Sequence, residues 1–325
     1  MITIGIESTA HTFGVAILRD DKVLSNVKDS YTTKSGGMIP GRSADHHVDV
    51  CDVVLKNSLE KSGVKLSEVD IIAFSQGPGI GHCLRIGAVF ARSLSILLKK
   101  PLVGVNHCIA HLEIGRLSGA TDPILLYASG ANTQIIAYDG GKYRIFGETL
   151  DIGIGNLLDT VGRALGLGFP AGPTIEKFAK GGKKYVPLPY AVKGMDVSFG
   201  GLHTNLKHKI QSGKFSKEDL CYSLQETVFA MLVEVSERAM AHCEKKELVL
   251  GGGVACNSRL KEMANIMCSE RGAKCFIPQN QFLVDNAAMI GLTGYLMFKA
   301  GNKITVEDSA IRPYERTDDV EVNWR

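Results

Sequence analysis

The chain contains 325 residues, of which 45% are hydrophobic and 22% charged, and its formal net charge is +3. This length exceeds the size at which a single hydrophobic core usually stops growing, so we expect two domains or lobes. The composition is typical of a globular α/β protein and excludes disordered, collagen-like and disulfide-built chains, while the small positive charge allows a nucleic-acid partner without requiring one.

Two stretches of the chain resemble each other, which indicates an internal duplication. Residues 4–16 align without a gap on residues 125–137, and Ser, Ala, Thr and Ala recur in register. Each copy reads as an apolar strand, a tight turn of small and hydroxyl residues, and a second strand, and a third short strand follows at 23–24 or 143–146. We therefore predict two related lobes.

The rest of each half alternates between helix and strand patterns. The first half is predicted to contain a helix at 44–61, a strand at 71–75, a helix at 85–98 and a strand at 102–105. The second half is predicted to contain a helix at 220–243, a strand at 248–250, a helix at 257–271, a strand at 275–277 and a helix at 286–299. This order predicts mixed sheets covered by helices, with a cleft between two lobes. We place lobe I at 1–120, lobe II at 121–300, and a C-terminal tail packing on the lobes at 301–325.

Four tight turns have the composition of phosphate-binding sites, because small and hydroxyl residues let backbone amides face an anion. They lie at 8–10, 129–131, 77–81 and 251–253. None of them matches the common phosphate-loop or dinucleotide fingerprints. A bound nucleotide would therefore be held in another way, and an ordinary strand-to-helix connection is the alternative for each turn.

His107 and His111 are four residues apart, so they share one face if the segment is helical. That spacing suits a shared metal ion, although two separately hydrogen-bonded histidines are the alternative. A metalloprotease of the H-E-x-x-H type needs a glutamate after the first histidine, and Cys108 occupies that position. Asp285 is a candidate oxygen ligand, with an ordinary helix N-cap as its other interpretation.

The sequence predicts a cytoplasmic protein without a membrane segment. No uninterrupted apolar run approaches the roughly 20 residues of a membrane span, and the first predicted strand, 2–6, begins without a secretory signal. The eight cysteines form no C-x-x-C pair, which is typical of reduced thiols and argues against a cysteine zinc site.

The whole chain resembles the universal tRNA threonylcarbamoyladenosine transferase family, in its archaeal and eukaryotic branch, formerly labelled O-sialoglycoprotein endopeptidase. Six segments carry the resemblance: IGIESTAHT (4–12), QGPGIGHCLRIG (76–87), NHCIAH (106–111), LLDTVGRALG (157–166), LGGGVACN (250–257) and DNAAMI (285–290). The resemblance implies the duplicated fold of actin and the sugar kinases (the ASKHA fold). It also implies transfer of threonylcarbamoyl from threonylcarbamoyl-AMP to N6 of adenosine 37 in tRNAs that read codons beginning with A.

By this resemblance the chain holds one divalent metal, Fe(2+) in preference to Zn(2+). The implied ligands are His107, His111, Tyr127 and Asp285. Tyrosine is a poor ligand at its free pKa of about 10, which makes Tyr127 the least secure of the four.

The resemblance also implies binding of threonylcarbamoyl-AMP and of ATP- or ADP-type nucleotides. The matching positions are Tyr127, Ala128, Ser129, Gly130, Ala131, Asp159, Gly172, Glu176, Gly252 and Asn257. Carboxylates can accept hydrogen bonds from ribose hydroxyls, and glycines allow the backbone to approach a ligand.

One position departs from the bacterial pattern. Bacterial members carry an Asp-Glu pair where this chain has His11 and Thr12, so a carboxylate mechanism is excluded there. His11 is a candidate for proton transfer or phosphate binding, or is a turn residue packed beside the cleft.

The implied partners are tRNA and the subunits of a KEOPS-type complex: a small atypical, RIO-like kinase that some archaea fuse downstream, a small dimerisation subunit and a further small subunit. Residues 34–42, followed by His46 and His47, form a basic segment that is either a contact for the tRNA backbone or a solvated loop. Two other functions stay open from the residues alone: an actin-like nucleotide-binding regulatory ATPase and a metallopeptidase.

Overall fold

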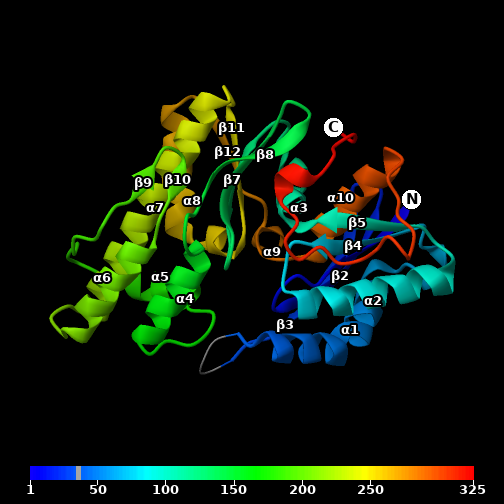
Figure 1. Ribbon diagram of the computed structural model, residues 1–325, viewed down its shortest axis with the longest axis horizontal. Coiled ribbons are helices and arrows are strands. Elements are labelled where there is room, and N and C mark those ends of the chain that lie inside the picture. The colour runs from blue at the N-terminus through cyan, green and yellow to red at the C-terminus, as the bar shows by residue number, and fades with distance from the viewer. Residues whose placement is uncertain (34–37) are drawn as a thin grey trace.

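The computed structural model describes residues 1–33 and 38–325 and shows two lobes, each built on a five-stranded sheet (Figure 1). The first sheet has the order β3-β2-β1-β4-β5. Its strands are β1 (Ile2–Glu7), β2 (Thr12–Arg19), β3 (Lys22–Ser30), β4 (Ile71–Gly77) and β5 (Leu102–Asn106). The first three strands form an antiparallel meander, and β4 and β5 extend the sheet in parallel from β1.

The second sheet repeats this arrangement in the order β8-β7-β6-β11-β12. Its strands are β6 (Ile124–Ala128), β7 (Thr133–Asp139), β8 (Lys142–Glu148), β11 (Glu247–Gly251) and β12 (Lys274–Phe276). The two hairpins that resemble each other in sequence, β1-β2 and β6-β7, occupy equivalent places in the two sheets. The predicted duplication is therefore confirmed.

Two helices cover one face of the first sheet, α1 (Pro40–Ser62) and α2 (Gly81–Leu98) (Figure 1). Both begin four residues before their predicted starts at 44 and 85. Proline is tolerated in a first helical turn because its missing N–H has no intrahelical partner there, which allows α1 to begin at Pro40.

Helix α2 is long and apolar enough to cross a membrane by length and composition alone. In this fold it has another role, because Leu84, Ala88 and Ala91 recur at helical spacing and are buried toward the sheet. Its Gly87 lies against the first hairpin, where an added Cβ would come within 1.9 Å of Ser8 Oγ. Helix α2 thus behaves as a core helix.

The helices of the second lobe form its largest core. They are α4 (Ile154–Ala164), α5 (Gly172–Ala179), α6 (Gly200–Gln211), α7 (Lys217–His242) and α8 (Ser258–Glu270), with a short hairpin of β9 (Val192–Lys193) and β10 (Asp196–Val197). Only α7 and α8 were predicted. The others are short and interrupted by glycine and proline, so their hydrophobic periodicity is brief.

Two helices lie between the sheets, α3 (His107–Glu113) and α10 (Ala287–Lys299). Helix α3 follows β5 of the first sheet, yet Ile109 and Leu112 pack in one cluster with residues of β6 and β11. Helix α10 follows the second sheet but packs on β1, β2 and β4 of the first. The contact is close, since a Cβ on Gly5 would lie 2.2 Å from the carbonyl oxygen of Ala287. Helix α10 therefore packs with the first sheet, although the predicted boundaries assign residues 121–300 to lobe II. Those boundaries remain a prediction.

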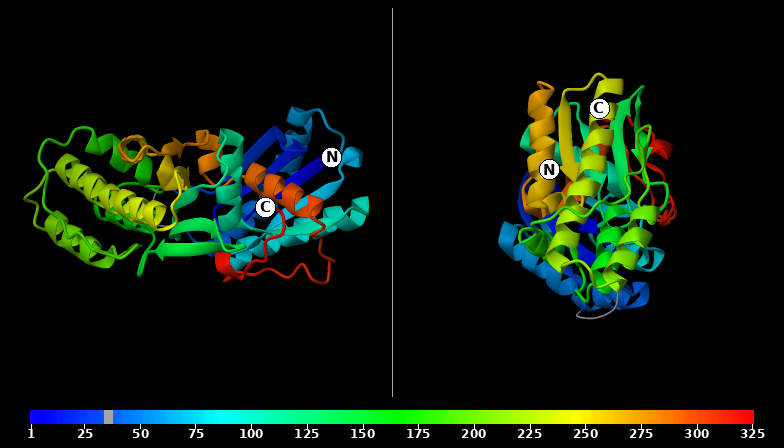
Figure 2. Two further views of the ribbon diagram at one scale, coloured as in Figure 1. Left: turned by 90° about the horizontal axis from the view of Figure 1, so that it is seen from above. Right: turned by 90° about the vertical axis from the view of Figure 1, so that its left-hand side faces the viewer.

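The remaining short elements connect these layers. They are α9 (Asn280–Leu283) and the 3₁₀ turns η1 (Leu66–Glu68), η2 (Ile114–Ser118), η3 (Gly253–Cys256) and η4 (Thr317–Asp319). After α10 the chain runs along the first lobe toward the second (Figure 2). A backbone bridge joins Ile304 to Leu102 of β5, and the amide of Arg312 donates to the carbonyl oxygen of Gln76 at 2.8 Å.

Candidate metal and nucleotide site

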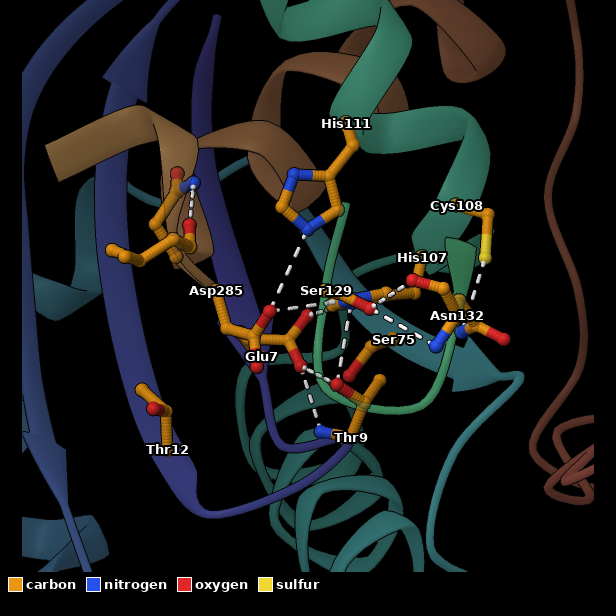
Figure 3. Close-up of polar contacts among 12 residues, drawn as sticks. Glu7, Thr9, Thr12, Ser75, His107, Cys108, His111, Ser129, Asn132 and Asp285 are labelled. Carbon is orange, nitrogen blue, oxygen red and sulfur yellow. Dashed lines mark hydrogen bonds and ion pairs between the residues drawn. The ribbon is translucent and has the colours of Figure 1, made fainter. Parts of the chain in front are cut away.

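Helix α3 places His107 and His111 on one face, with ring centroids 4.8 Å apart (Figure 3). The helix starts at His107 because the side chain of Asn106 accepts hydrogen bonds from the amides of Cys108 and Ile109 at 3.0 and 3.2 Å. Both imidazoles are buried. The geometry that the four-residue spacing predicts is therefore present.

Asp285 approaches the same point from the start of α10. Its Oδ1 lies 3.5 Å from Nε2 of His107 and 3.5 Å from Nε2 of His111. Asn286, not Asp285, is the N-cap of α10, since its side chain accepts from the amide of Met289. The Asp285 carboxylate is thereby free of a capping role, and the three ligand atoms lie within 4.8 Å of one another.

Tyr127 brings the second sheet to this cluster. Its hydroxyl lies 3.0 Å from Nε2 of His107, and its ring centroid lies 4.7 Å from that of His111. Burial raises the pKa of Tyr127 well above its ordinary value, so without a bound cation the phenol keeps its proton.

His111 has no hydrogen-bond partner among the described residues for either ring nitrogen, although it is fully buried. A buried polar atom without a partner is costly, and a metal-binding imidazole is one of its common explanations. Burial also lowers the pKa of His111, which favours the neutral form that binds metals. Burial acts to raise the pKa of Asp285, but the two histidines outweigh it and lower that pKa, so the carboxylate is ionised.

Glu7, at the end of β1, is a site residue that the sequence analysis missed. Its side chain is fully buried, and Oε2 lies 3.0 Å from Nδ1 of His107. Its Oε1 accepts from the amide and hydroxyl of Thr9 at 2.7 and 2.5 Å. Burial acts to lower the pKa of His107, but Glu7 outweighs it and raises that pKa. In the repeat alignment Glu7 falls opposite Ala128, and this charged residue in an apolar strand was the available signal.

These residues fit a divalent metal. Two imidazoles, one carboxylate and a phenol oxygen are a donor set that suits non-haem iron and also zinc. If His107 binds the metal, Glu7 would supply the outer carboxylate that commonly accepts a hydrogen bond from a histidine ligand. The buried ring of His111, which makes no hydrogen bond among the described residues and has only the 3.5 Å contact of Nε2 with Asp285, supports this fit most directly.

The turn after Tyr127 has the properties of an anion site. The amide and hydroxyl of Ser129 both bond to the carbonyl oxygen of Asn132, at 2.9 and 3.0 Å, which closes the turn. Among the described residues, neither Gly130 nor Ala131 donates its amide to a protein acceptor. Those two amides remain for an anionic ligand.

Glycines allow neighbouring elements to approach this turn. Gly252 has φ +88°, and a Cβ there would lie 2.3 Å from the carbonyl oxygen of Ala128. A Cβ on Gly155, at the start of α4, would lie 2.6 Å from Cα of Gly130. The start of α4 and the end of β11 thus pack directly on the second hairpin.

The other predicted nucleotide positions gather in the second lobe. Asp159 of α4 accepts from the amide of Ala171, one residue before Gly172, at 2.7 Å. Glu176 of α5 accepts from the amide and hydroxyl of Ser258 at 3.1 and 2.5 Å. Asn257, which precedes Ser258, is the N-cap of α8. The fold therefore joins α4, α5 and α8 through these side chains.

His11 lies in the first hairpin turn. Its ring packs edge-on against Phe169, with centroids 5.9 Å apart, and its electrostatic effect reaches both Asp159 and Asp285. It therefore faces the second lobe.

The basic segment predicted at 34–42 falls only partly within the described residues. Residues 34–37 lie outside the described residues, and Pro40 begins α1. His47 is buried and lies 3.1 Å from the carbonyl oxygen of Ala10, while His46 pairs with Asp29 at 2.8 Å. Both histidines are engaged within the protein.

Comparison with known proteins identifies the family of this chain. The sequence model of the tRNA N6-adenosine threonylcarbamoyltransferase family matches residues 22–292. The chain is 54% identical to the tRNA N6-adenosine threonylcarbamoyltransferase of Thermococcus kodakarensis, with 100% of both chains covered. It is 51% identical to the Xenopus laevis protein of that name, covering 100% of this chain and 99% of the relative.

A longer relative is the probable bifunctional tRNA threonylcarbamoyladenosine biosynthesis protein of Methanosarcina mazei, 52% identical over 99% of this chain and 59% of the relative. Among solved structures, HypF of T. kodakarensis matches with a TM-score of 0.66 at 14% identity, covering 92% of this chain and 47% of HypF. The (R)-2-hydroxyglutaryl-CoA dehydratase component A of Acidaminococcus fermentans matches with a TM-score of 0.54 at 15% identity, covering 93% and 100%. These likenesses show the duplicated ASKHA-type fold. The full-length sequence identity shows more: this chain belongs to the tRNA N6-adenosine threonylcarbamoyltransferase family.

Proposed function

We propose that this chain transfers the threonylcarbamoyl group from threonylcarbamoyl-AMP to N6 of adenosine 37 in tRNAs that read codons beginning with A. One observation carries the proposal beyond family membership. The cluster of His107, His111 and Asp285 lies between the lobes and is joined through Tyr127 to the turn at Ser129. An acyl-adenylate bound with its phosphate on that turn would place its acyl group toward the cluster.

His107, His111, Asp285 and Tyr127 would hold one divalent metal, Fe(2+) in preference to Zn(2+), which would act as a Lewis acid toward oxygens of the acyl-adenylate. Other residues of the protein would orient the ligands and bind the phosphate. Glu7 fixes the orientation of His107 through the 3.0 Å contact at Nδ1. The free amides of the Ser129 turn bind phosphate and stabilise the AMP that leaves.

The transfer forms a bond between N6 of adenosine and the carbamoyl carbon and breaks the bond from that carbon to the phosphate oxygen of AMP. The electron pair of that bond leaves with AMP, and N6 gives up one proton. We assign acceptance of that proton to His11, which faces the second lobe beside Asp159. The carboxylates of Asp159 and Glu176 would accept hydrogen bonds from the ribose, together with Gly172, Gly252 and Asn257 around the nucleoside.

The charge distribution supports tRNA as the partner. Residues 177–217 contain nine lysines and one acidic residue, Asp196, which gives 9 − 1 = +8. The rest of the chain therefore carries +3 − 8 = −5. Eight of these nine lysines are exposed. A basic segment of this density attracts phosphate backbones.

We further propose that the chain works in a KEOPS-type assembly with a RIO-like kinase, a dimerisation subunit and a further small subunit. The bifunctional Methanosarcina relative, which is longer than this chain, supports a functional link to a second activity. We also propose a cytoplasmic location, which agrees with eight cysteines that are all free thiols.

The experiment combines the purified chain, the partner subunits, threonylcarbamoyl-AMP and unmodified tRNA, with detection of the modified nucleoside by mass spectrometry. We expect product from the parental chain and none from His107→Ala or His111→Ala. Absence of product from the parental chain under these conditions refutes the proposal. ATP hydrolysis that survives both substitutions would favour the regulatory ATPase, which has only the fold in its support.

The metallopeptidase alternative lacks a general base. Cys108 stands where that mechanism needs glutamate, and burial raises the pKa of its thiol to about 12. A buried neutral thiol cannot activate water.

A further inference from the structure

Glu113 is a fully buried carboxylate at the last position of α3, the helix that carries both histidines. It is not among the metal-ligating residues. A buried charge is unfavourable unless it is paired, and an acidic residue at a helix C-terminus also opposes the helix dipole. Glu113 must therefore have strong partners where it is.

Three side chains supply those partners. The hydroxyl of Tyr143 on β8 and Nε of Arg116 both donate to the Glu113 carboxylate. Nε of Arg325 donates to Oε1 of Glu113 at 3.1 Å and lies 3.0 Å from the Tyr143 hydroxyl. Glu113 thereby connects α3 to the second sheet and to the tail at 301–325.

Arg325 is itself held tightly. Its side chain is only 8% exposed, and its guanidinium lies over the rings of Tyr138 and Tyr143 at 5.0 and 5.4 Å. Nη1 of Arg325 lies 3.4 Å from Oδ1 of Asp122. This geometry fixes the position of the charge that faces Glu113.

The tail also holds the other end of α3. The side-chain amide of Asn106, the N-cap of the helix, donates to Glu315 at 3.0 Å. Upstream, the tail is anchored on the first sheet through Ile304 and Arg312. A helix of seven residues has little stability of its own, so contacts at its two ends determine where it lies.

We propose that Glu113 is a positioning residue for the metal site. Arg325 and Tyr143 hold Glu113, and Glu113 sets α3 so that His107 and His111 meet Asp285. The inference deepens the proposed function and rests on its metal site. The ion pair between Glu113 and Arg325 would act by positioning α3, without contact to the metal or to the substrate.

The test measures Zn²⁺ binding to the metal-free full chain by competition with a chromophoric chelator. The variants are Glu113→Gln, Tyr143→Phe, Arg325→Ala and the conservative Arg325→Lys. We expect the dissociation constant to rise about 10-fold for the first three, the effect typical of losing an outer partner of a metal site, and less for Arg325→Lys. Hydrogen exchange of the amides at 107–113 should also become faster in the first three variants and change less in Arg325→Lys.

Arg316→Ala is the matched control, because Arg316 lies in the same tail and its ion pairs join Glu148 on β8 and Asp318, not a residue of α3. It should bind Zn²⁺ like the parental chain. Melting temperatures of the metal-free proteins separate the two roles, since a purely structural role lowers the melting temperature without changing the affinity of the folded protein. If Glu113→Gln does not fold, Arg325→Ala and Tyr143→Phe decide the question.

Unchanged Zn²⁺ affinity in the folded variants overturns the inference. Zn²⁺ binding by the parental chain without tRNA modification in the complete assembly contradicts the proposed function and leaves the inference standing. A parental chain that binds no Zn²⁺ overturns the metal site and the inference with it.

Discussion

Nδ1 of His107 lies 3.0 Å from Oε2 of Glu7, so a residue in the first strand orients a candidate metal ligand from the third helix. The contact is fully buried on the Glu7 side, and both oxygens of Glu7 are used, one on His107 and the other on Thr9. The carboxylate therefore fixes the ring and makes its other nitrogen a better ligand.

We predict that Glu7→Gln weakens metal binding by about 10-fold and Glu7→Ala by more, up to about 100-fold. Glutamine still accepts a hydrogen bond but carries no charge, whereas alanine removes the acceptor. Isothermal titration of the metal-free protein with Zn²⁺ measures the effect, and Glu68→Gln, an exposed carboxylate in η1, is the control. Equal affinity for Glu7→Ala and the parental chain would show that Glu7 has no such role.

We predict that His111→Leu abolishes transfer without lowering the free energy of unfolding of the metal-free protein. Nδ1 of His111 has no hydrogen-bond partner among the described residues, and Nε2 has only the 3.5 Å contact with Asp285, which His107 also faces. Leucine therefore removes a desolvation cost of about 1–3 kcal/mol and leaves Asp285 its contact with His107. Urea unfolding in the presence of a chelator measures stability, alongside the tRNA assay. A marked loss of stability would show that the histidine contributes to folding.

We predict that stability falls in acid because of His47. Burial, with the charge of His46, lowers the pKa of His47 to about 4. Since the unfolded chain takes up this proton at its ordinary pKa of about 6.5, the folded state loses stability as pH falls from about 6.5 to 4, by about 3 kcal/mol in all. His47→Asn should flatten this part of the stability profile in urea titrations. An unchanged slope would assign the acid sensitivity to other groups.

We predict that Gly155→Ala weakens nucleotide binding. The added Cβ would lie 2.6 Å from Cα of Gly130, so the start of α4 must move away from the Ser129 turn. Gly201→Ala is the control, since a Cβ at Gly201, also in the first turn of a helix, meets nothing within 4 Å. Fluorescent ATP-analogue titrations compare the two, and equal affinities would place the nucleotide phosphate elsewhere.

We predict that replacing Lys207, Lys209 and Lys214 by glutamine weakens tRNA binding and its salt dependence. Each lost phosphate contact should reduce the slope of log K against log[salt] by about one. The control replaces Lys56, Lys61 and Lys65 of the first lobe, which changes the net charge equally. Filter binding over a range of salt concentrations measures the slopes, and equal slopes for the two triple variants would exclude the lysine-rich segment as a specific contact.

Much of this fold could be predicted from the sequence, because the duplicated hairpins carry the same pattern twice. The position of α10 could not. Residues Ala287 to Tyr295 are buried on every side, so no apolar stripe indicates which sheet the helix covers. Helices α4 to α6 were missed because their patterns are short.

The site was predicted unevenly for physical reasons. The spacing of His107 and His111 indicates a shared face directly, since it depends only on helix geometry. Asp285 was ambiguous because aspartate also caps helices, and the neighbouring Asn286 turned out to take that role. Glu7 could not be assigned because its partner His107 lies 100 residues further along the chain. Glu113 could not be assigned because Tyr143 and Arg325, which connect it to the second sheet and the tail, are 30 and 212 residues away.

The crossed placement of α3 and α10 has a thermodynamic consequence. Asp285 moves with the first sheet, on which α10 packs, whereas Tyr127 is a residue of the second. A rotation of one lobe against the other would therefore change the distance between atoms that a bound ion would hold together. Binding of an ion and closure of the lobes would then be linked equilibria. A ligand that draws the lobes together would raise the affinity for the ion, and the ion would raise the affinity for that ligand by the same factor.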